Sequence, residues 1–146
     1  MLFRSDEQLR EAIVLLEPKW SEKKLELDLE LPEVLFVGHS SLLFTVWTNL
    51  IGNAIKYTDN GGTVSVLLSE DVDSVQVTVR DTGIGMSEET KAHIFDKFYQ
   101  GDTSRKSQGN GLGLAICKEI VKKCGGEITV ESKLRIGSAF LVKLNK

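Results

Sequence analysis

Apolar residues recur at helical spacing in three segments, which predicts long helices over residues 6–23, 41–58 and 112–124. Asp6 is the expected cap of the first helix, and Pro18 is expected to end or kink it. Ser40 or Ser41 is the expected cap of the second helix. A glycine pair at 125–126 is a typical stop for the third.

Strict alternation of leucine with acidic residues over 25–31 predicts a half-buried strand, and a short apolar run follows at 34–37. Further strands are predicted at 63–69, 74–80, 127–132 and 138–144, and the first two of these are expected to form a hairpin. A short helix capped by Ser87 is predicted over 87–94. Because strands and helices mix without regular alternation, the fold class is α+β. We expect a two-layer α/β sandwich, in which a mixed, mostly antiparallel sheet packs on about three helices.

Length and composition fit one domain over residues 1–146, with no internal repeat. The net charge of −3 argues against a nucleic-acid partner, which would favour a basic surface. No run approaches the ~20 apolar residues that a membrane span needs, so direct membrane insertion is not expected. Cys117 and Cys124 are interpreted as small buried apolar residues of a cytosolic protein.

The predicted central helix carries Asn49, Asn53 and Lys56 on its polar side, at positions i, i+4 and i+7. A solvated face is one interpretation. The two asparagines favour a functional one, since each costs up to ~0.7 kcal/mol against alanine in a helix interior. Amide oxygens are suitable ligands for Mg²⁺.

Asp81 follows a β-like run and precedes Gly83 and Gly85. Taken alone, this pattern is also typical of a turn. A fixed carboxylate can accept a hydrogen bond from an exocyclic amine, and glycines let the backbone approach phosphates. Neither glycine cluster matches the dinucleotide fingerprint, and the chain has no phosphate-loop lysine motif, so a nucleotide site here needs another design.

A second glycine cluster, Gly109, Gly111 and Gly113, opens the third helix. Its free amides suit an anion, and its glycines also suit a hinge; we expect both, as a lid that closes when phosphate binds. Arg105 precedes this cluster and could stabilise charge on a γ-phosphate, although a solvated basic residue is the alternative. Phe95 and Phe98 are expected to anchor the segment before it to the core. Together these parts predict a site for a purine nucleoside triphosphate.

The sequence resembles the catalytic, ATP-binding domain of bacterial sensor histidine kinases, within the superfamily (Bergerat fold) shared with DNA gyrase and a heat-shock chaperone. Four motifs carry the resemblance, in order along the chain: an asparagine-rich box at 49–57, a first glycine box at 81–86, a phenylalanine box at 95–99 and a second glycine box at 109–116.

The resemblance implies ATP and Mg²⁺ as ligands and assigns each matched residue a role. Asp81 would accept from the adenine amine, with Tyr57 near the base and Gly83 and Gly85 lining the adenine site. Asn53 would hold Mg²⁺ with Asn49 beside it, and Lys56 would approach the phosphates as a catalytic residue. A flexible lid over about residues 95–110 would supply Arg105 as a second catalytic cation. Backbone amides near the phosphates would come from Gly111, Leu112, Gly113 and Leu114.

Relatives that hydrolyse ATP place a glutamate one helical turn before the metal-binding asparagine, where this chain has Asn49. An amide cannot take a proton from water, so phosphoryl transfer is expected rather than rapid hydrolysis. Gln100 and Asn110 depart from residues frequent in the family.

The resemblance implies two partners: the dimerisation and histidine phospho-acceptor domain of a parent kinase, and a response regulator downstream. No acceptor segment precedes residue 6, so the chain is expected to lack that domain. Localisation is expected in the cytoplasm, with a parent protein that can be anchored in the cell membrane. A non-catalytic ATP-sensing module and an anti-sigma-type serine kinase stay open as alternatives.

Overall fold

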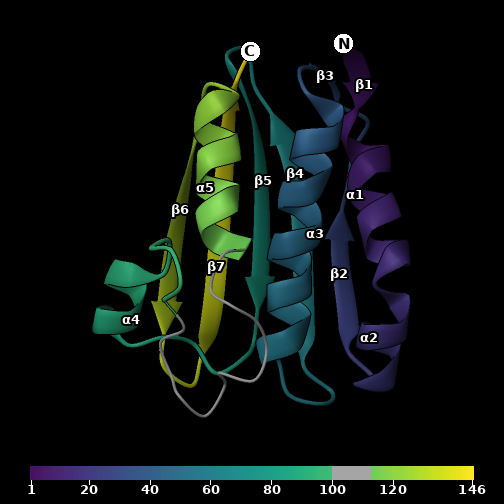
Figure 1. Ribbon diagram of the computed structural model, residues 1–146. Coiled ribbons are helices and arrows are strands. Elements are labelled where there is room, and N and C mark those ends of the chain that lie inside the picture. Colours follow the sequence, from purple (N-terminus) through teal and green to yellow (C-terminus); the bar gives the residue numbers. More distant parts are fainter. Residues whose placement is uncertain (100–112) are drawn as a thin grey trace.

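A computed structural model describes residues 1–99 and 113–146. Its main feature is a five-stranded sheet in the order β2-β4-β5-β7-β6, shown in Figure 1. β2 pairs with β4 in parallel, and the other pairings are antiparallel. The strands are β1 (Leu2–Arg4), β2 (Glu26–Glu30), β3 (Leu35–Val37), β4 (Thr63–Glu70), β5 (Ser74–Asp81), β6 (Gly126–Lys133) and β7 (Gly137–Asn145).

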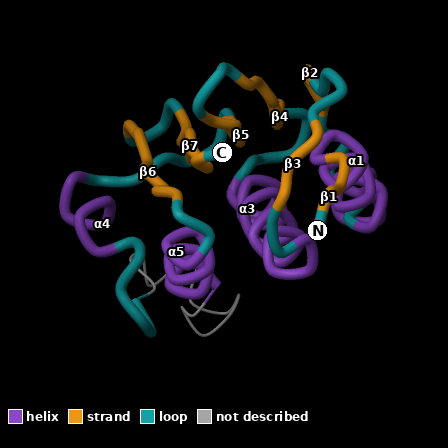
Figure 2. Tube along the Cα trace, turned by 90° about the horizontal axis from the view of Figure 1, so that it is seen from above, coloured by secondary structure: helices purple, strands orange, loops and turns teal. Residues whose placement is uncertain are grey.

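The helices α1 (Ser5–Leu15), α3 (Ser40–Tyr57) and α5 (Gly113–Lys123) lie on one face of this sheet, as Figure 2 shows. α3 lies between α1 and α5 and contacts both. The prediction of an α+β two-layer sandwich with a mixed, mostly antiparallel sheet is confirmed. The described helices are α1 (Ser5–Leu15), α2 (Glu17–Glu22), α3 (Ser40–Tyr57), α4 (Glu88–His93) and α5 (Gly113–Lys123).

The ends of two helices differ from the prediction. α1 begins at Ser5, and Asp6 does not cap it; its carboxylate instead accepts from the Val34 amide at 3.2 Å and pairs with Arg4. Neither Ser40 nor Ser41 caps α3, which starts without a side-chain cap after His39. The Ser87 cap of α4 is confirmed, since its hydroxyl accepts from the Thr90 amide at 3.1 Å.

A two-stranded ribbon of β1 and β3 stands apart from the main sheet. The sequence indicated the apolar run of β3, but not β1. Pro18 stands in the first turn of α2, and the predicted helix over 6–23 is divided around Leu16. Proline suits a first turn because its missing N–H has no intrahelical acceptor there.

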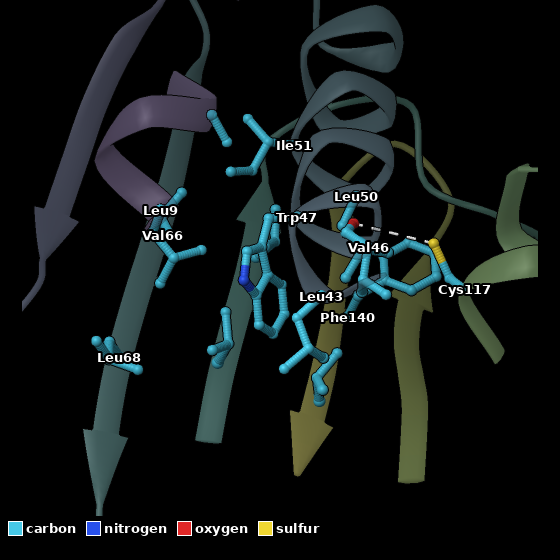
Figure 3. Packing of buried hydrophobic residues seen from close by; sticks show 14 of the residues in the cluster. Leu9, Leu43, Val46, Trp47, Leu50, Ile51, Val66, Leu68, Cys117 and Phe140 are labelled. Atoms are coloured by element: carbon cyan, nitrogen blue, oxygen red, sulfur yellow. Dashed lines mark hydrogen bonds between the residues drawn. The ribbon is translucent and has the colours of Figure 1, made fainter. Parts of the chain in front are cut away.

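The core lies between α3 and the sheet, where α3 contacts β4 and β5, and Figure 3 shows Leu43, Val46 and Trp47 of α3 lying between the labelled Val66 and Phe140. Trp47 is 1% exposed, and its indole Nε1 donates to Gln8 Oε1 of α1 at 2.8 Å. Cys117 is buried against the Val46 carbonyl, and burial raises the pKa of its thiol to about 12; Cys124 is only half-buried. Burying a large apolar side chain contributes ~1.5–3 kcal/mol, so this packing fixes α3 on the sheet.

None of the helices in the described parts of the chain is long and apolar enough to span a membrane.

Candidate functional site

Asp81 is the last residue of β5 and is 7% exposed. Its Oδ1 accepts hydrogen bonds from the amides of Gly83, at 2.9 Å, and Ser138, at 3.3 Å. Burial raises the pKa of this carboxyl, and the two amide hydrogen bonds oppose the shift. Because both amides bond to the same oxygen, the carboxylate is held in one orientation by the backbone around it.

Residues 82–86, which follow β5 and contain Gly83 and Gly85, form a glycine segment that is hydrogen-bonded to the protein on two sides. The Ile84 amide donates to the Tyr57 carbonyl at the end of α3, at 3.2 Å, and the Ile84 carbonyl accepts from the Arg135 amide at 2.6 Å. The Met86 amide donates to Ser132 Oγ of β6 at 2.8 Å. The segment is therefore fixed between the last turn of α3 and the β6–β7 hairpin.

The two glycines of this segment have separate physical reasons to be glycine. A Cβ on Gly83 would collide with the Tyr57 carbonyl oxygen. Gly85 has φ +67°, and a Cβ there would collide with the backbone oxygen of Lys133. At both positions glycine lets two backbone segments of the protein pack closely, whereas the sequence pattern indicated close approach of the backbone to a ligand.

The polar side of α3 carries Asn49, Asn53 and Lys56, all half-buried. Asn49 Nδ2 donates to the Thr45 carbonyl at 2.8 Å, which orients its amide. Its Oδ1 faces the start of α5, since a Cβ on Gly113 would lie 2.8 Å from that oxygen. Neutral amide oxygens on successive turns fit the oxygen ligands that Mg²⁺ takes beside substrate phosphates.

Lys56 and Tyr57 end α3 together, with the Lys56 ammonium 4.9 Å from the centre of the Tyr57 ring. A cation over an aromatic face is attracted by the ring electrons. The positive charge of Lys56 therefore lies at the C-terminal end of α3, where the Tyr57 carbonyl also contacts the glycine segment.

The structure thus brings two groups of predicted site residues to α3. Tyr57 contacts the segment that includes Gly83, while Asn49 meets Gly113 of α5. Leu114 is half-buried and packs against the core. Arg105, Gly111 and Leu112 lie outside the described residues.

The two phenylalanines before that gap differ. Phe95 packs edge-on against Phe140 of β7, with ring centres 6.1 Å apart, as predicted for an anchor. The prediction for Phe98 is wrong, because its side chain is 68% exposed and its backbone has φ +65°.

Ser132 and Ser138 were missed by the sequence analysis. Their hydroxyls are 2.8 Å apart, one beside the glycine segment and the other on the residue that donates to Asp81. Both serines reach the site through strand pairing, because Ser138 pairs with Asp81 across β5 and β7 and Ser132 pairs with Ser138 across β6 and β7. β5 is far from β7 in sequence, and only their register reveals the contact.

Comparison with known families gives one match over most of the chain. The family described as histidine kinase-, DNA gyrase B-, and HSP90-like ATPase matches residues 38–146. This range contains the asparagines of α3, Asp81, the glycine segment and the start of α5.

Among curated relatives, the sensor histidine kinase RppB of Synechocystis is 45% identical over 122 residues, which cover 82% of this chain and 27% of the relative. The heme sensor protein HssS of Staphylococcus saprophyticus is 41% identical over 126 residues, covering 86% of this chain and 27% of the relative. The chain therefore spans about a quarter of the length of these relatives.

Solved structures share the whole fold. The mycobacterial sensor histidine kinase MprB has a TM-score of 0.90 at 26% identity, covering 99% of this chain and 97% of that one. Full-length ShkA in complex with AMPPNP has a TM-score of 0.82 at 30% identity, covering 98% of this chain and 30% of that one. Histidine kinase ThkA in complex with the response regulator protein TrrA has a TM-score of 0.84 at 27% identity, covering 100% and 41%.

Proposed function

The chain belongs to the histidine kinase-, DNA gyrase B- and HSP90-like ATPase family, and from this premise we propose that it is the kinase half of a two-component signalling protein. It binds Mg-ATP and donates the γ-phosphoryl group to a histidine on a separate dimerisation and acceptor domain. The observation that carries the proposal is the convergence of Asp81, the glycine segment and the end of α3 in one hydrogen-bonded unit.

Adenine is recognised by Asp81 in this proposal. The two backbone amides occupy Oδ1, so Oδ2 is the oxygen that accepts from the exocyclic amine of the base. Tyr57 lies beside the base, and Gly83 and Gly85 form the wall of the adenine site. The ShkA complex with AMPPNP supports an adenine nucleotide as ligand, because that relative shares the fold.

The phosphates lie along α3 towards the start of α5. Asn53 and Asn49 would hold Mg²⁺, which when bound supplies positive charge to the phosphate oxygens. Lys56 adds a second positive charge, and Gly113 and Leu114 supply backbone close to the phosphates. Arg105, Gly111, Leu112 and the lid over about residues 95–110 enter the proposal from the sequence alone.

In the transfer step, an imidazole nitrogen of the acceptor histidine bonds to the γ-phosphorus as the bond to the bridging oxygen breaks, and ADP leaves. The N–H proton on the other imidazole nitrogen is released to water. Asn49 cannot serve as a base for water, which favours transfer over hydrolysis. The names of the relatives, all sensor proteins or histidine kinases among those compared, favour this reading over a silent ATP sensor or an anti-sigma-type serine kinase.

A response regulator is the proposed downstream partner, as in the ThkA complex with TrrA. The proposal places the chain in the cytoplasm, where ATP is available, whether or not the parent protein is anchored in a membrane.

Thermal unfolding with and without Mg-ATP tests the binding step. Nucleotide at 100 times its dissociation constant should stabilise the protein by ~2.7 kcal/mol. Asn53→Ala should remove the magnesium-dependent part of this gain, since it deletes an amide oxygen that holds the ion. An unchanged melting temperature of the wild type in saturating Mg-ATP would remove the basis of the proposal.

Labelled ATP then tests the transfer. Mixed with a matching acceptor domain, the chain should label that domain, and the label should be lost in acid because phosphohistidine is acid-labile. An acid-stable label indicates a serine kinase, and binding without labelling indicates a sensor.

A further inference from the structure

Lys23, which follows α2, is hydrogen-bonded to the C-terminal end of α3. Its ammonium donates to three backbone carbonyls, those of Ile55 at 2.9 Å, Lys56 at 2.8 Å and Thr58 at 3.0 Å. The last carbonyls of a helix have no intrahelical donor and form the negative end of the helix dipole. A positive charge with three donors satisfies them together.

The backbone of Lys23 takes part as well. Its carbonyl accepts from the Gly61 amide at 2.9 Å, in the turn between α3 and β4. The next residue, Lys24, has φ +54°, which turns the chain from α2 towards β2. Lys23 is therefore bonded to α3 through its side chain and to the turn after α3 through its backbone.

The carbonyls that Lys23 holds lie on both sides of Tyr57. The Tyr57 carbonyl accepts from the Ile84 amide at 3.2 Å, and Gly83 lies so close to that oxygen that a Cβ would not fit. This carbonyl thus fixes the glycine segment on its α3 side, while the Arg135 amide and Ser132 Oγ hold it on the side of the β6–β7 hairpin. The same segment supplies the Gly83 amide that orients Asp81.

We propose that Lys23 is a positioning residue for the nucleotide site, acting through the end of α3 and the Tyr57 carbonyl on the glycine segment that forms the adenine wall. The inference rests on the proposed function and extends it to Lys23, which lies in the connection between α2 and β2 and outside all four sequence motifs. Lys23 touches neither base nor phosphate in this proposal. Its effect is to keep the last turn of α3 wound and in place before nucleotide arrives.

Two measurements distinguish positioning from a general contribution to stability. Lys23→Met removes the charge and the donors but keeps an unbranched side chain that is only one heavy atom shorter. The dissociation constant for Mg-ADP, measured by calorimetry well below the melting temperature, should rise about fivefold or more, the lower end of typical coupling between linked sites. In nucleotide-free protein, hydrogen exchange of the Ile84 amide should accelerate by roughly tenfold, while the Val77 amide in β5 stays protected.

Lys19→Met is the matched control, because Lys19 is an exposed lysine of α2. It should leave both readouts at the wild-type values. Lys23→Arg keeps the charge and several donors and should restore most of the affinity. If Lys23→Met does not fold, Lys23→Gln, which removes the charge but keeps two N–H donors on a shorter side chain, is measured, and both readouts should change in the same direction but less.

The proposal is overturned if a Lys23 variant melts at lower temperature but keeps the wild-type Mg-ADP affinity and Ile84 exchange, since Lys23 is then a structural cap only. Wild-type protein that binds no Mg-ADP contradicts the proposed function instead. In that case the Ile84 exchange still decides whether Lys23 controls the glycine segment.

Discussion

Asp81 combines a fixed orientation with an unfavourable charge. Burial raises the pKa of its carboxyl above the ordinary value of 3.8. The folded state then holds the proton more tightly than the unfolded chain. The stability that this carboxyl contributes is greatest below its ordinary pKa and falls as the pH rises through the folded-state pKa. At neutral pH the ionised carboxylate therefore lowers the stability of the nucleotide-free protein relative to its protonated form. This cost indicates that the carboxylate serves nucleotide binding rather than folding.

Replacing Asp81 by asparagine separates these two effects. The amide oxygen can accept from Gly83 and Ser138 as Oδ1 does now, and the amide nitrogen then takes the place of Oδ2. That nitrogen is a donor facing the donor of the adenine amine. Losing a hydrogen bond to a charged group costs about 1.5–3 kcal/mol, so calorimetry should show Mg-ADP affinity lowered by at least about tenfold.

The stability of the same variant should move the other way. At pH 7, nucleotide-free Asp81→Asn should unfold at the same urea concentration as the wild type or at a higher one, because no buried charge remains. As the pH falls towards 4, the wild-type carboxyl gains its proton and the difference should shrink. A variant clearly less stable than the wild type at pH 7 would show that the ionised carboxylate stabilises the fold, contrary to this account.

At the scale of elements, Gly85 links the glycine segment to the β6–β7 hairpin. Gly85→Ala should cost about 2–4 kcal/mol of unfolding free energy, because it adds backbone strain of ~1–3 kcal/mol to a collision with the Lys133 backbone. Urea denaturation measures the change. The adenine site should be damaged with it, since the segment must shift away from the hairpin.

Two other glycines serve as controls for Gly85. Gly61 also has positive φ, at +81°, but a Cβ there meets no atom of the described residues within 4 Å; Gly61→Ala should show only the strain, about 1–2 kcal/mol. Gly52 lies inside α3, and within residues 1–99 and 113–146 a Cβ there would have no neighbour closer than 4 Å, so Gly52→Ala should stabilise by up to ~1 kcal/mol. If Gly85→Ala and Gly61→Ala lost the same unfolding free energy, the backbone at Lys133 would have moved away from the new Cβ at little cost.

The elements themselves could be predicted because their signals are local. The hairpin of β4 and β5 and the helix α5 follow from alternation, helical spacing and glycine stops. What failed depends on partners elsewhere in the chain. Asp6 has the right residue type for a cap, yet Arg4 and the Val34 amide use its carboxylate.

In the candidate site, too, residues with a local sequence signal could be predicted and residues that act through distant partners could not. Asn49 stands out in the sequence because asparagine is costly inside a helix, whereas Asp81 and Gly83 are also typical of a turn and are recognised only together with the other motifs. Ser138 and Lys23 carry no such signal, since a serine in a strand and a lysine after a helix are ordinary. Their roles come from the β5–β7 register and from the approach of the chain after α2 to the end of α3, and no local pattern encodes either.

At the scale of the whole molecule, both edge strands of the main sheet carry exposed acidic residues. β2 exposes Glu26, Asp28 and Glu30, and β6 exposes Glu127 and Glu131. An edge strand offers unpaired backbone groups to another chain, and charges on it discourage such pairing. Two copies that met edge to edge through these strands would bring like charges together.

Neutralising the β2 edge should therefore promote self-association. In a variant with Glu26→Gln, Asp28→Asn and Glu30→Gln, up to ~1 kcal/mol of repulsion is removed for each like-charge pair across an interface. Sedimentation velocity should show a concentration-dependent dimer that the wild type does not form. The effect should be larger at low ionic strength, where the wild-type charges are least screened.

A control variant removes three acidic charges from helices instead, at Glu17, Glu22 and Glu119, all exposed. It changes the net charge by the same amount and should sediment as the wild type does. Association of both variants would mean that net charge, rather than its position on the sheet edge, keeps the copies apart. Association of the β2 variant alone would place the repulsion at the β2 edge, because an edge strand, unlike the surface of a helix, offers backbone groups through which a second chain can extend the sheet.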